Sequence, residues 1–127
     1  DQILDSTQVI ARNLSNKELP QMVVRAMWGN INPKGGFNFT HVHHSGWLSG
    51  VYYIQLLEKN NDIDFKDTRS ARMTDFQRSS LIKYEYFSHY PKVGELLLFP
   101  SWLHHVVTPN TSEQNRISIS FNVELIV

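Results

Sequence analysis

The chain has 127 residues, enough for one domain with a buried core, and its seven Phe, five Tyr and three Trp exclude a disordered protein. Twelve Lys and Arg balance twelve Asp and Glu, so the charge disfavours nucleic acid as a partner and does not favour an anionic membrane surface. Cysteine is absent, which excludes disulfides and leaves imidazole, carboxylate and water as ligands for any metal.

No signal peptide and no apolar run of transmembrane length is visible, so we expect a cytoplasmic protein with no membrane partner. The chain opens at Asp1 rather than at a methionine, which is typical of a processed form or of a fragment that lacks a short N-terminal part. We predict a single domain over residues 1–127.

The hydrophobic pattern predicts one helix followed by many short strands. Residues 1–19 show an imperfect apolar stripe of helical period, and Pro20 ends the helix. Strands are expected at residues 21–28, 37–43, 47–57, 63–66, 95–99, 104–108 and 116–126. Residues 67–91 are irregular and charged, and they are expected to form a flap or to contain an embedded strand. This order predicts a mainly β fold, a sandwich or jelly roll with the helix packed outside.

The last predicted strand has two faces of opposite character, because strand side chains alternate. One face is polar and the other apolar: Arg116, Ser118, Ser120 and Asn122 against Ile117, Ile119, Phe121 and Val123. Two arrangements fit this alternation. Either the apolar face points into a sandwich and the polar face meets water, or the polar face lines a cavity and the apolar face packs under the helix.

Histidines are concentrated at two places in the sequence. His41 and His43 lie one residue apart on a predicted strand, so their imidazoles point the same way, whereas His44 points to the other face and is excluded as a ligand. His104 and His105 also face opposite ways, so only one of them can join the pair. Such a pair alone is more often two ordinary polar residues. A third histidine would complete one face of a metal's coordination sphere, as in a non-haem iron oxygenase.

The residues after the second histidine cluster carry a family resemblance. Ten residues separate His105 from Arg116, which begins an Arg-x-Ser sequence ending at Ser118. This resembles the 2-oxoglutarate and Fe(II) dependent oxygenases, in which the distal iron histidine is followed at that spacing by the arginine that binds the co-substrate. The resemblance covers about residues 28–122. Within the superfamily, the chain is similar in particular to one bacterial and phage subfamily. The segments that carry it are SGVYYI (49–54), FPSWL (99–103) and RISISFN (116–122).

The chain is also similar, more distantly, to prolyl hydroxylases, which have a His-x-Asp motif, a Tyr-Tyr-Leu strand and a distal histidine in the same order. The resemblance implies a double-stranded β-helix (jelly roll) that uses Fe(II), O2 and 2-oxoglutarate to hydroxylate a substrate, releasing succinate and CO2. It implies a metal held by His41, His43 and His105. It also implies that Arg116 binds the distal carboxylate of 2-oxoglutarate, and that Ser118 and Tyr53 contact the same group.

Position 43 departs from the superfamily pattern, because the usual second ligand is a carboxylate and here it is His43. Three neutral imidazoles still bind a divalent first-row metal and leave positions open for other ligands. The site is one unit more positive than usual. This favours a dianion such as 2-oxoglutarate and weakens the preference for Fe(II) over other metals.

Two other kinds of protein fit part of the pattern. A cupin shares the fold and can bind metal through His-x-His, but residues 45–53 lack the glutamate that cupins usually add, and the Arg-x-Ser sequence has no cupin counterpart. A non-catalytic jelly-roll binding module is the second alternative.

The substrate of an oxygenase is expected to be a small molecule or a protein side chain. Trp28, Asn30 and Asn38 are expected in core or turn positions rather than at the substrate entrance, and Trp102 is expected to brace the distal histidine.

Overall fold

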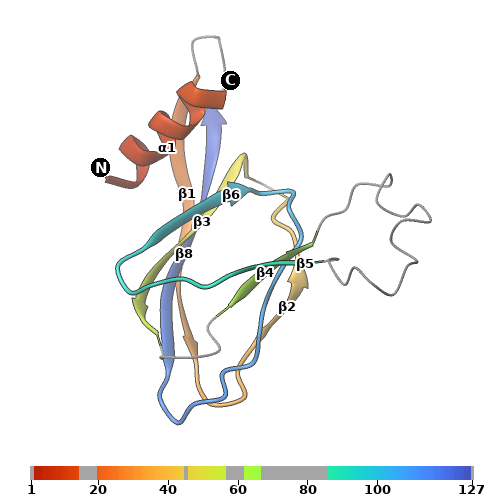
Figure 1. The fold of residues 1–127 in the computed structure, drawn as a ribbon. Helices are drawn as coiled ribbons and strands as arrows, with labels where there is room; N and C mark the ends of the chain where they lie inside the picture. The colour runs from red at the N-terminus through yellow and green to blue at the C-terminus, as the bar shows by residue number, and fades with distance from the viewer. Residues whose placement is uncertain (1, 15–19, 45, 57–61, 67–85, 127) are drawn as a thin grey trace, which may run out of the picture.

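The computed structural model describes residues 2–14, 20–44, 46–56, 62–66 and 86–126. Within these residues one helix precedes eight strands (Figure 1). The elements are α1 (Gln2–Leu14), β1 (Gln21–Asn32), β2 (Asn38–His41), β3 (Leu48–Gln55), β4 (Ile63–Lys66), β5 (Tyr86–His89), β6 (Leu96–Pro100), β7 (His105–Val107) and β8 (Arg116–Ile126).

The strands form two four-stranded antiparallel sheets. The order is β1-β8-β3-β6 in the first, called sheet 1 below, and β2-β7-β4-β5 in the second, called sheet 2. The chain passes repeatedly from one sheet to the other, so neighbours within a sheet are mostly distant in sequence (Figure 1). The predicted mainly β jelly roll with an N-terminal helix is therefore confirmed.

All seven predicted strands are present, most of them with shifted ends. The ranges expected for the fourth and last strands match β4 and β8, whereas β1 runs on to Asn32 because it pairs with β8 along its length. The expected strand at 37–43 is shorter, since β2 ends at His41. The helix is described only to residue 14, and the rest of its expected range lies outside the described residues. Of the irregular stretch, residues 86–89 form β5, and residues 67–85 lie outside the described part.

The helix packs its inner stripe against one end of sheet 1. Thr7 and Ala11, one helical turn apart, are both 0% exposed, and the Thr7 hydroxyl donates a 2.7 Å hydrogen bond to the carbonyl of Ile3. Ala11 belongs to a buried apolar cluster with Phe121 and Val123 of β8. Burying a side chain such as Phe121 contributes about 1.5–3 kcal/mol. The apolar face of β8 thus lies under the helix, and the second of the two arrangements is correct.

Gly50 allows this packing of Phe121. A Cβ at position 50 would lie 2.3 Å from the Cζ atom of Phe121, so only glycine leaves room for the ring at this point of β3. A second buried cluster, formed by Ile63, Phe65 and Phe99, lies between the sheets. Sheet 1 is therefore apolar on its helix side, and its other face is free to carry polar groups.

None of the helices in the described residues is long and apolar enough to cross a membrane.

Candidate functional site

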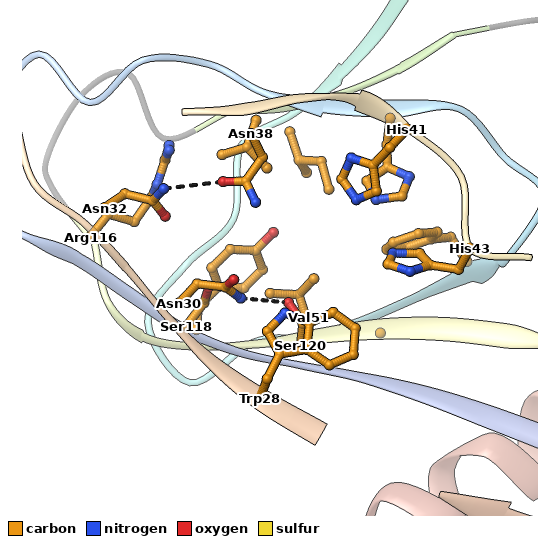
Figure 2. A pocket seen from close by; sticks show the side chains of 16 residues that line it. Trp28, Asn30, Asn32, Asn38, His41, His43, Val51, Arg116, Ser118 and Ser120 are labelled. Carbon is orange, nitrogen blue, oxygen red and sulfur yellow. Dashed lines mark hydrogen bonds between the residues drawn. The ribbon is translucent and has the colours of Figure 1, made fainter. Parts of the chain in front are cut away.

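A pocket opens between the two sheets, with about 600 Å³ of space free of atoms, part of it open to solvent. Both sheets contribute to its walls, and the polar face of β8 is one of them (Figure 2). The lining residues are Trp28, Asn30, Asn32, Asn38, His41, His43, Gly50, Val51, Tyr53, Ile63, Phe99, His105, Val107, Arg116, Ser118 and Ser120.

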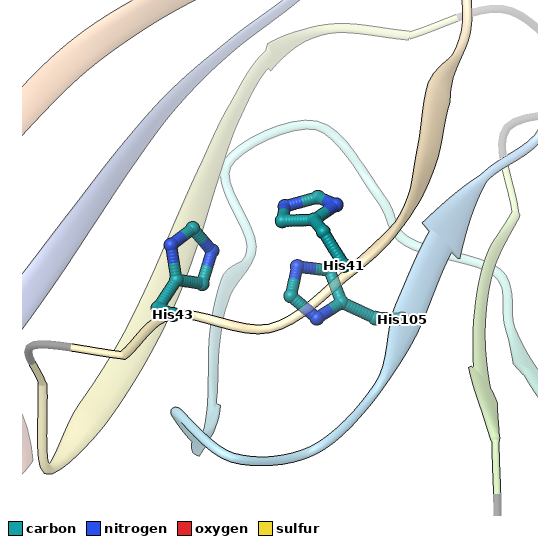
Figure 3. Close-up of side chains that lie close together, drawn as sticks. All are labelled: His41, His43 and His105. Atoms are coloured by element: carbon teal, nitrogen blue, oxygen red, sulfur yellow. The ribbon is translucent and has the colours of Figure 1, made fainter.

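Three histidines meet in this pocket. Each of His41, His43 and His105 offers a ring nitrogen, and these nitrogens lie within 4.8 Å of one another (Figure 3). His41 and His105 face each other across the β2–β7 ladder, with ring centroids 4.2 Å apart. The His43 ring lies 5.0 Å from that of His41 and 5.3 Å from that of His105. The spacing allows one ion to contact all three rings.

Backbone carbonyls orient two of the rings. His41 Nδ1 donates a 2.6 Å hydrogen bond to the carbonyl of Phe39, and His105 Nδ1 donates one of 2.9 Å to that of Leu103. A carbonyl only accepts, so in the neutral ring the proton is on Nδ1 and the Nε2 lone pair is available to a metal. The third histidine is held through its main chain, since the N–H of His43 donates 2.9 Å to the carbonyl of Ser101.

Burial keeps two of the rings neutral. It lowers the pKa of His105 to about 4, with smaller contributions from the neighbouring histidines and an opposing one from the Leu103 carbonyl. Burial likewise lowers the pKa of His43, with His41 and His44 adding to the effect. Phe99 packs against His105 with ring centroids 4.7 Å apart, which helps explain its dry surroundings. Neutral imidazole is the form that binds a metal.

Arg116 lies on the polar face of β8 that forms one wall of the pocket, and it is only 1% exposed. Its Nη2 donates a 2.9 Å hydrogen bond to the carbonyl of Thr108. Its Nε and Nη1 are buried and have no partner among the described residues. Burial lowers the pKa of Arg116, while Tyr53 and Asp62 oppose this, and a guanidinium remains charged in any case. The pocket therefore contains a positive group with unused donors.

Tyr53 and Ser118 lie beside this guanidinium. They are paired across the β3–β8 ladder, and both are buried in the pocket wall. Burial and, to a smaller degree, Glu95 raise the pKa of Tyr53, against the effect of Arg116, so its phenol keeps its proton at neutral pH. A phenol and a serine hydroxyl add two possible donors for an anion bound at Arg116.

The expectation for Trp28, Asn30 and Asn38 was wrong, because all three line the pocket. Trp28 and Asn30 lie on the pocket face of β1, where they pair with Ser120 and with Ser118. The Asn30 amide donates 2.7 Å to the Ser120 hydroxyl, and the Trp28 ring lies 5.7 Å from that of His43 (Figure 2). Their period-two spacing was the available signal, but only the pairing with β8 shows which face it marks.

Two further polar residues that the sequence did not single out as site residues line the pocket. Asn32 donates a 3.1 Å hydrogen bond to the side-chain oxygen of Asn38, which links β1 to β2 across the pocket (Figure 2). Ser120 lies on the polar face that the sequence did predict. The bracing expected of Trp102 was also wrong, since this residue is 65% exposed. Phe99 and the Leu103 carbonyl contact the distal histidine instead.

Neither of the other histidines of the two clusters joins the metal-binding group. His44 is exposed and lies in a turn beyond the end of β2, so strand alternation does not place it, and the group contains His105 rather than His104. The three predicted ligands, together with Arg116, Ser118 and Tyr53, thus line one pocket.

Comparison with known proteins gives the family of the chain. Residues 26–122 match the profile of the family described as "Putative 2OG-Fe(II) oxygenase", and the chain belongs to that family. The family uses Fe(II) and 2-oxoglutarate, and the histidine group described above could bind the metal. No curated protein sequence matches the chain.

Solved structures share the fold at low sequence identity. An oxidoreductase of the 2OG-Fe(II) oxygenase family from Burkholderia pseudomallei has a TM-score of 0.67 at 11% identity, over 93% of this chain and 57% of that one. A prolyl-4-hydroxylase from Pseudomonas putida has a TM-score of 0.64 at 16% identity, over 100% and 66%. The non-heme monooxygenase ThoJ, as a nickel complex, has 0.66 at 13%, over 97% and 49%. The chain thus spans about half to two thirds of these proteins.

Proposed function

We propose that this protein is a dioxygenase that uses Fe(II) and 2-oxoglutarate to hydroxylate a substrate, with release of succinate and CO2. The observation that carries the proposal is the presence in one pocket of three convergent imidazoles and a buried guanidinium whose Nε and Nη1 have no partner among the described residues. The first fits a divalent metal and the second fits a carboxylate. Membership of the family supports the same chemistry.

His41, His43 and His105 would hold the metal. The lone pairs of His41 and His105 are directed by hydrogen bonds to carbonyls, and burial favours the neutral form of His43 and His105. When bound, the iron supplies the activation of O2 that couples decarboxylation of 2-oxoglutarate to oxidation of the substrate. With three neutral ligands the site keeps the full charge of the metal, which favours an anionic co-substrate.

Arg116 would bind the distal carboxylate of 2-oxoglutarate. Its Nε and Nη1 lack partners, and a carboxylate would supply acceptors that the described residues do not. Tyr53 and Ser118 would donate further hydrogen bonds from the adjoining wall. The contact with Thr108 holds the guanidinium in place before the co-substrate arrives.

The substrate would approach beside Trp28. This residue is 37% exposed and lies against the His43 ring, so it belongs both to the surface and to the metal site. Asn30 and Ser120 separate it from the Arg116 end of the pocket. A small molecule or a protein side chain could enter here, and the indole would exclude water from the reacting centre.

The cytoplasmic location expected from the sequence also stays a prediction.

Anaerobic titration with Fe(II) and 2-oxoglutarate tests the proposal. The expected result is a visible charge-transfer band, followed by consumption of 2-oxoglutarate when O2 is admitted. His105→Ala should lose metal binding and the band together. Arg116→Met should keep metal binding and lower the affinity for 2-oxoglutarate by about 10- to 100-fold, because it removes a hydrogen bond to a charged group.

Arg25→Met is the matched control, because Arg25 is exposed and forms an ion pair with Glu124 on the surface. It removes the same group outside the pocket and should leave both affinities unchanged. A metal-loaded wild-type protein with no band and no turnover of 2-oxoglutarate would contradict the proposed function. Normal metal binding by His105→Ala would contradict the ligand assignment.

A further inference from the structure

Three buried polar side chains form a chain of hydrogen bonds that links β3, β8 and the residue after β6. Ser49 of β3, Ser101 directly after β6 and Asn122 of β8 are 2%, 1% and 7% exposed. The Ser49 hydroxyl donates 2.9 Å to Asn122 Oδ1 and lies 2.9 Å from the Ser101 hydroxyl. Ser49 has only one hydroxyl hydrogen, so Ser101 must donate to Ser49. We call these three residues the serine–asparagine network.

Ser101 connects this network to the metal site. Its carbonyl accepts the His43 N–H at 2.9 Å, and its own N–H donates 3.2 Å to the carbonyl of Trp47. The chain is therefore attached to Ser101 on both sides of the turn that follows His43. Gly46 passes so close that a Cβ there would lie 2.6 Å from the Ser101 hydroxyl oxygen. His43, Gly46 and Trp47 are thus all held close to Ser101.

His43 depends on this attachment more than the other two histidines do. His41 and His105 are paired within the β2–β7 ladder, and each ring is oriented by a carbonyl two residues earlier. His43 lies beyond the end of β2, and the hydrogen bond that anchors it is made by its main chain. The position of its backbone, from which the ring extends, is thus set at Ser101.

We propose that Ser49, Ser101 and Asn122 are positioning residues for His43. The network fixes the main chain at Ser101 and thereby sets the direction from which the His43 imidazole enters the metal site. This inference rests on the proposed function, because it takes His43 as a metal ligand. A buried polar network with all its members paired specifies one geometry, whereas apolar side chains of similar size would only fill the space.

Co(II) binding tests the proposal, because the visible absorption of the ion reports its coordination geometry as well as its affinity. Ser101→Ala keeps the carbonyl that binds His43 but removes the hydroxyl that fixes it, and Ser49→Ala removes the middle of the chain. Each should raise the Co(II) dissociation constant of the metal-free protein by about 10-fold, the lower end of the usual effect of residues behind metal ligands. Each should also alter the visible spectrum of the bound ion.

Thr7→Val is the matched control. Thr7 is 0% exposed and its hydroxyl is hydrogen-bonded inside α1, on the other side of sheet 1. The variant loses a buried hydroxyl bond of the same kind and should be similarly destabilised, yet its Co(II) dissociation constant should stay within about twofold of wild type. In a His43→Ala background, Ser101→Ala should have no further effect on Co(II), because the ligand it positions is gone.

Hydrogen exchange of the wild-type protein gives a second test that needs no variant. The His43 amide should be as well protected as that of Ser49. Rapid exchange at His43 with slow exchange at Ser49 would overturn the inference, as would wild-type Co(II) affinity in both network variants, or equal weakening by Thr7→Val. Failure of the wild-type protein to bind Co(II) would overturn the metal site itself, and the inference with it.

Discussion

Arg116 shows how far the pocket departs from what stability alone favours. A buried donor without a partner costs about 1–3 kcal/mol, and two nitrogens of the buried, charged Arg116 have no partner within the described part of the chain. Most buried polar groups in proteins are paired, so an exception requires an explanation. A ligand carboxylate would pair both the charge and the donors. The energetic cost of these unpaired donors is thus consistent with a binding site for an anion.

The burial of His105 makes the stability of the metal-free protein depend on pH. The folded protein binds a proton at this ring only near pH 4, whereas an unfolded chain binds it near pH 6.5. Between these values the unfolded state holds more protons, so lowering the pH favours unfolding. We expect the free energy of unfolding to fall from about pH 6.5 to about pH 4 through this group and to level off below. The free energy of unfolding can be measured at each pH by urea denaturation in the presence of a chelator, with tryptophan fluorescence as the signal.

His105→Asn isolates this contribution, because an amide nitrogen can donate to the Leu103 carbonyl but does not titrate. The stability difference between wild type and His105→Asn should shrink or reverse as the pH falls through this range. A difference that stays constant from pH 7 to pH 4 would show that His105 is not buried as a neutral ring. Carboxylates titrate equally in both proteins and cancel in the comparison.

At the scale of elements, β8 could be predicted from the sequence and β1 only in part. The alternation in β8 is local and defines its limits and its two faces. The pocket face of β1 depends on pairing with β8, about 90 residues away, and no local pattern shows whether Trp28 faces core or cavity. His43 reaches the metal group for a reason that alternation does not supply. The strand ends at His41, and the hydrogen bond from the His43 N–H to the Ser101 carbonyl places the backbone of His43.

Asn110 ties the loop before β8 to the end of β1. Its amide donates to the carbonyls of Asn32 (2.9 Å) and Gln114 (2.7 Å), and its Oδ1 accepts from the N–H of Ser112 (2.9 Å). The residue is 1% exposed, so Asn110→Ala would leave buried groups unpaired and should lower the free energy of unfolding by about 2–4 kcal/mol. Because this loop leads into Arg116, the variant should also lower the affinity for 2-oxoglutarate more than the affinity for the metal.

Glu113→Ala is the control within the same loop. Glu113 is exposed and forms an ion pair with Lys34, and such surface pairs contribute about 0–1 kcal/mol. Chemical denaturation and the two binding titrations should therefore give nearly wild-type values. Equal effects of Asn110→Ala and Glu113→Ala would mean that the buried amide does not hold the loop.

At the scale of the whole molecule, the pocket joins the two sheets. All three histidines belong to β2, β7 and the chain after β2, on the side of sheet 2, while Arg116, Ser118 and Tyr53 belong to β8 and β3 of sheet 1. The metal alone would therefore contact one side of the pocket. A 2-oxoglutarate bound to the metal and to Arg116 would link both sides.

This division predicts that metal and co-substrate stabilise the fold cooperatively. Ligands at 100 times their dissociation constant add about 2.7 kcal/mol, a rise in melting temperature on the order of 10 °C for a chain of this size. Under anaerobic conditions, Co(II) with 2-oxoglutarate should raise the melting temperature by more than the sum of the two separate shifts, because each ligand increases the affinity for the other. 2-Oxobutyrate, which has the keto acid but no distal carboxylate, should give a smaller shift with Co(II). In Arg116→Met the two keto acids should become equivalent. Equal shifts for the two acids in wild type would show that the co-substrate does not reach Arg116, and strictly additive shifts would show that the histidine and arginine sites do not share one ligand.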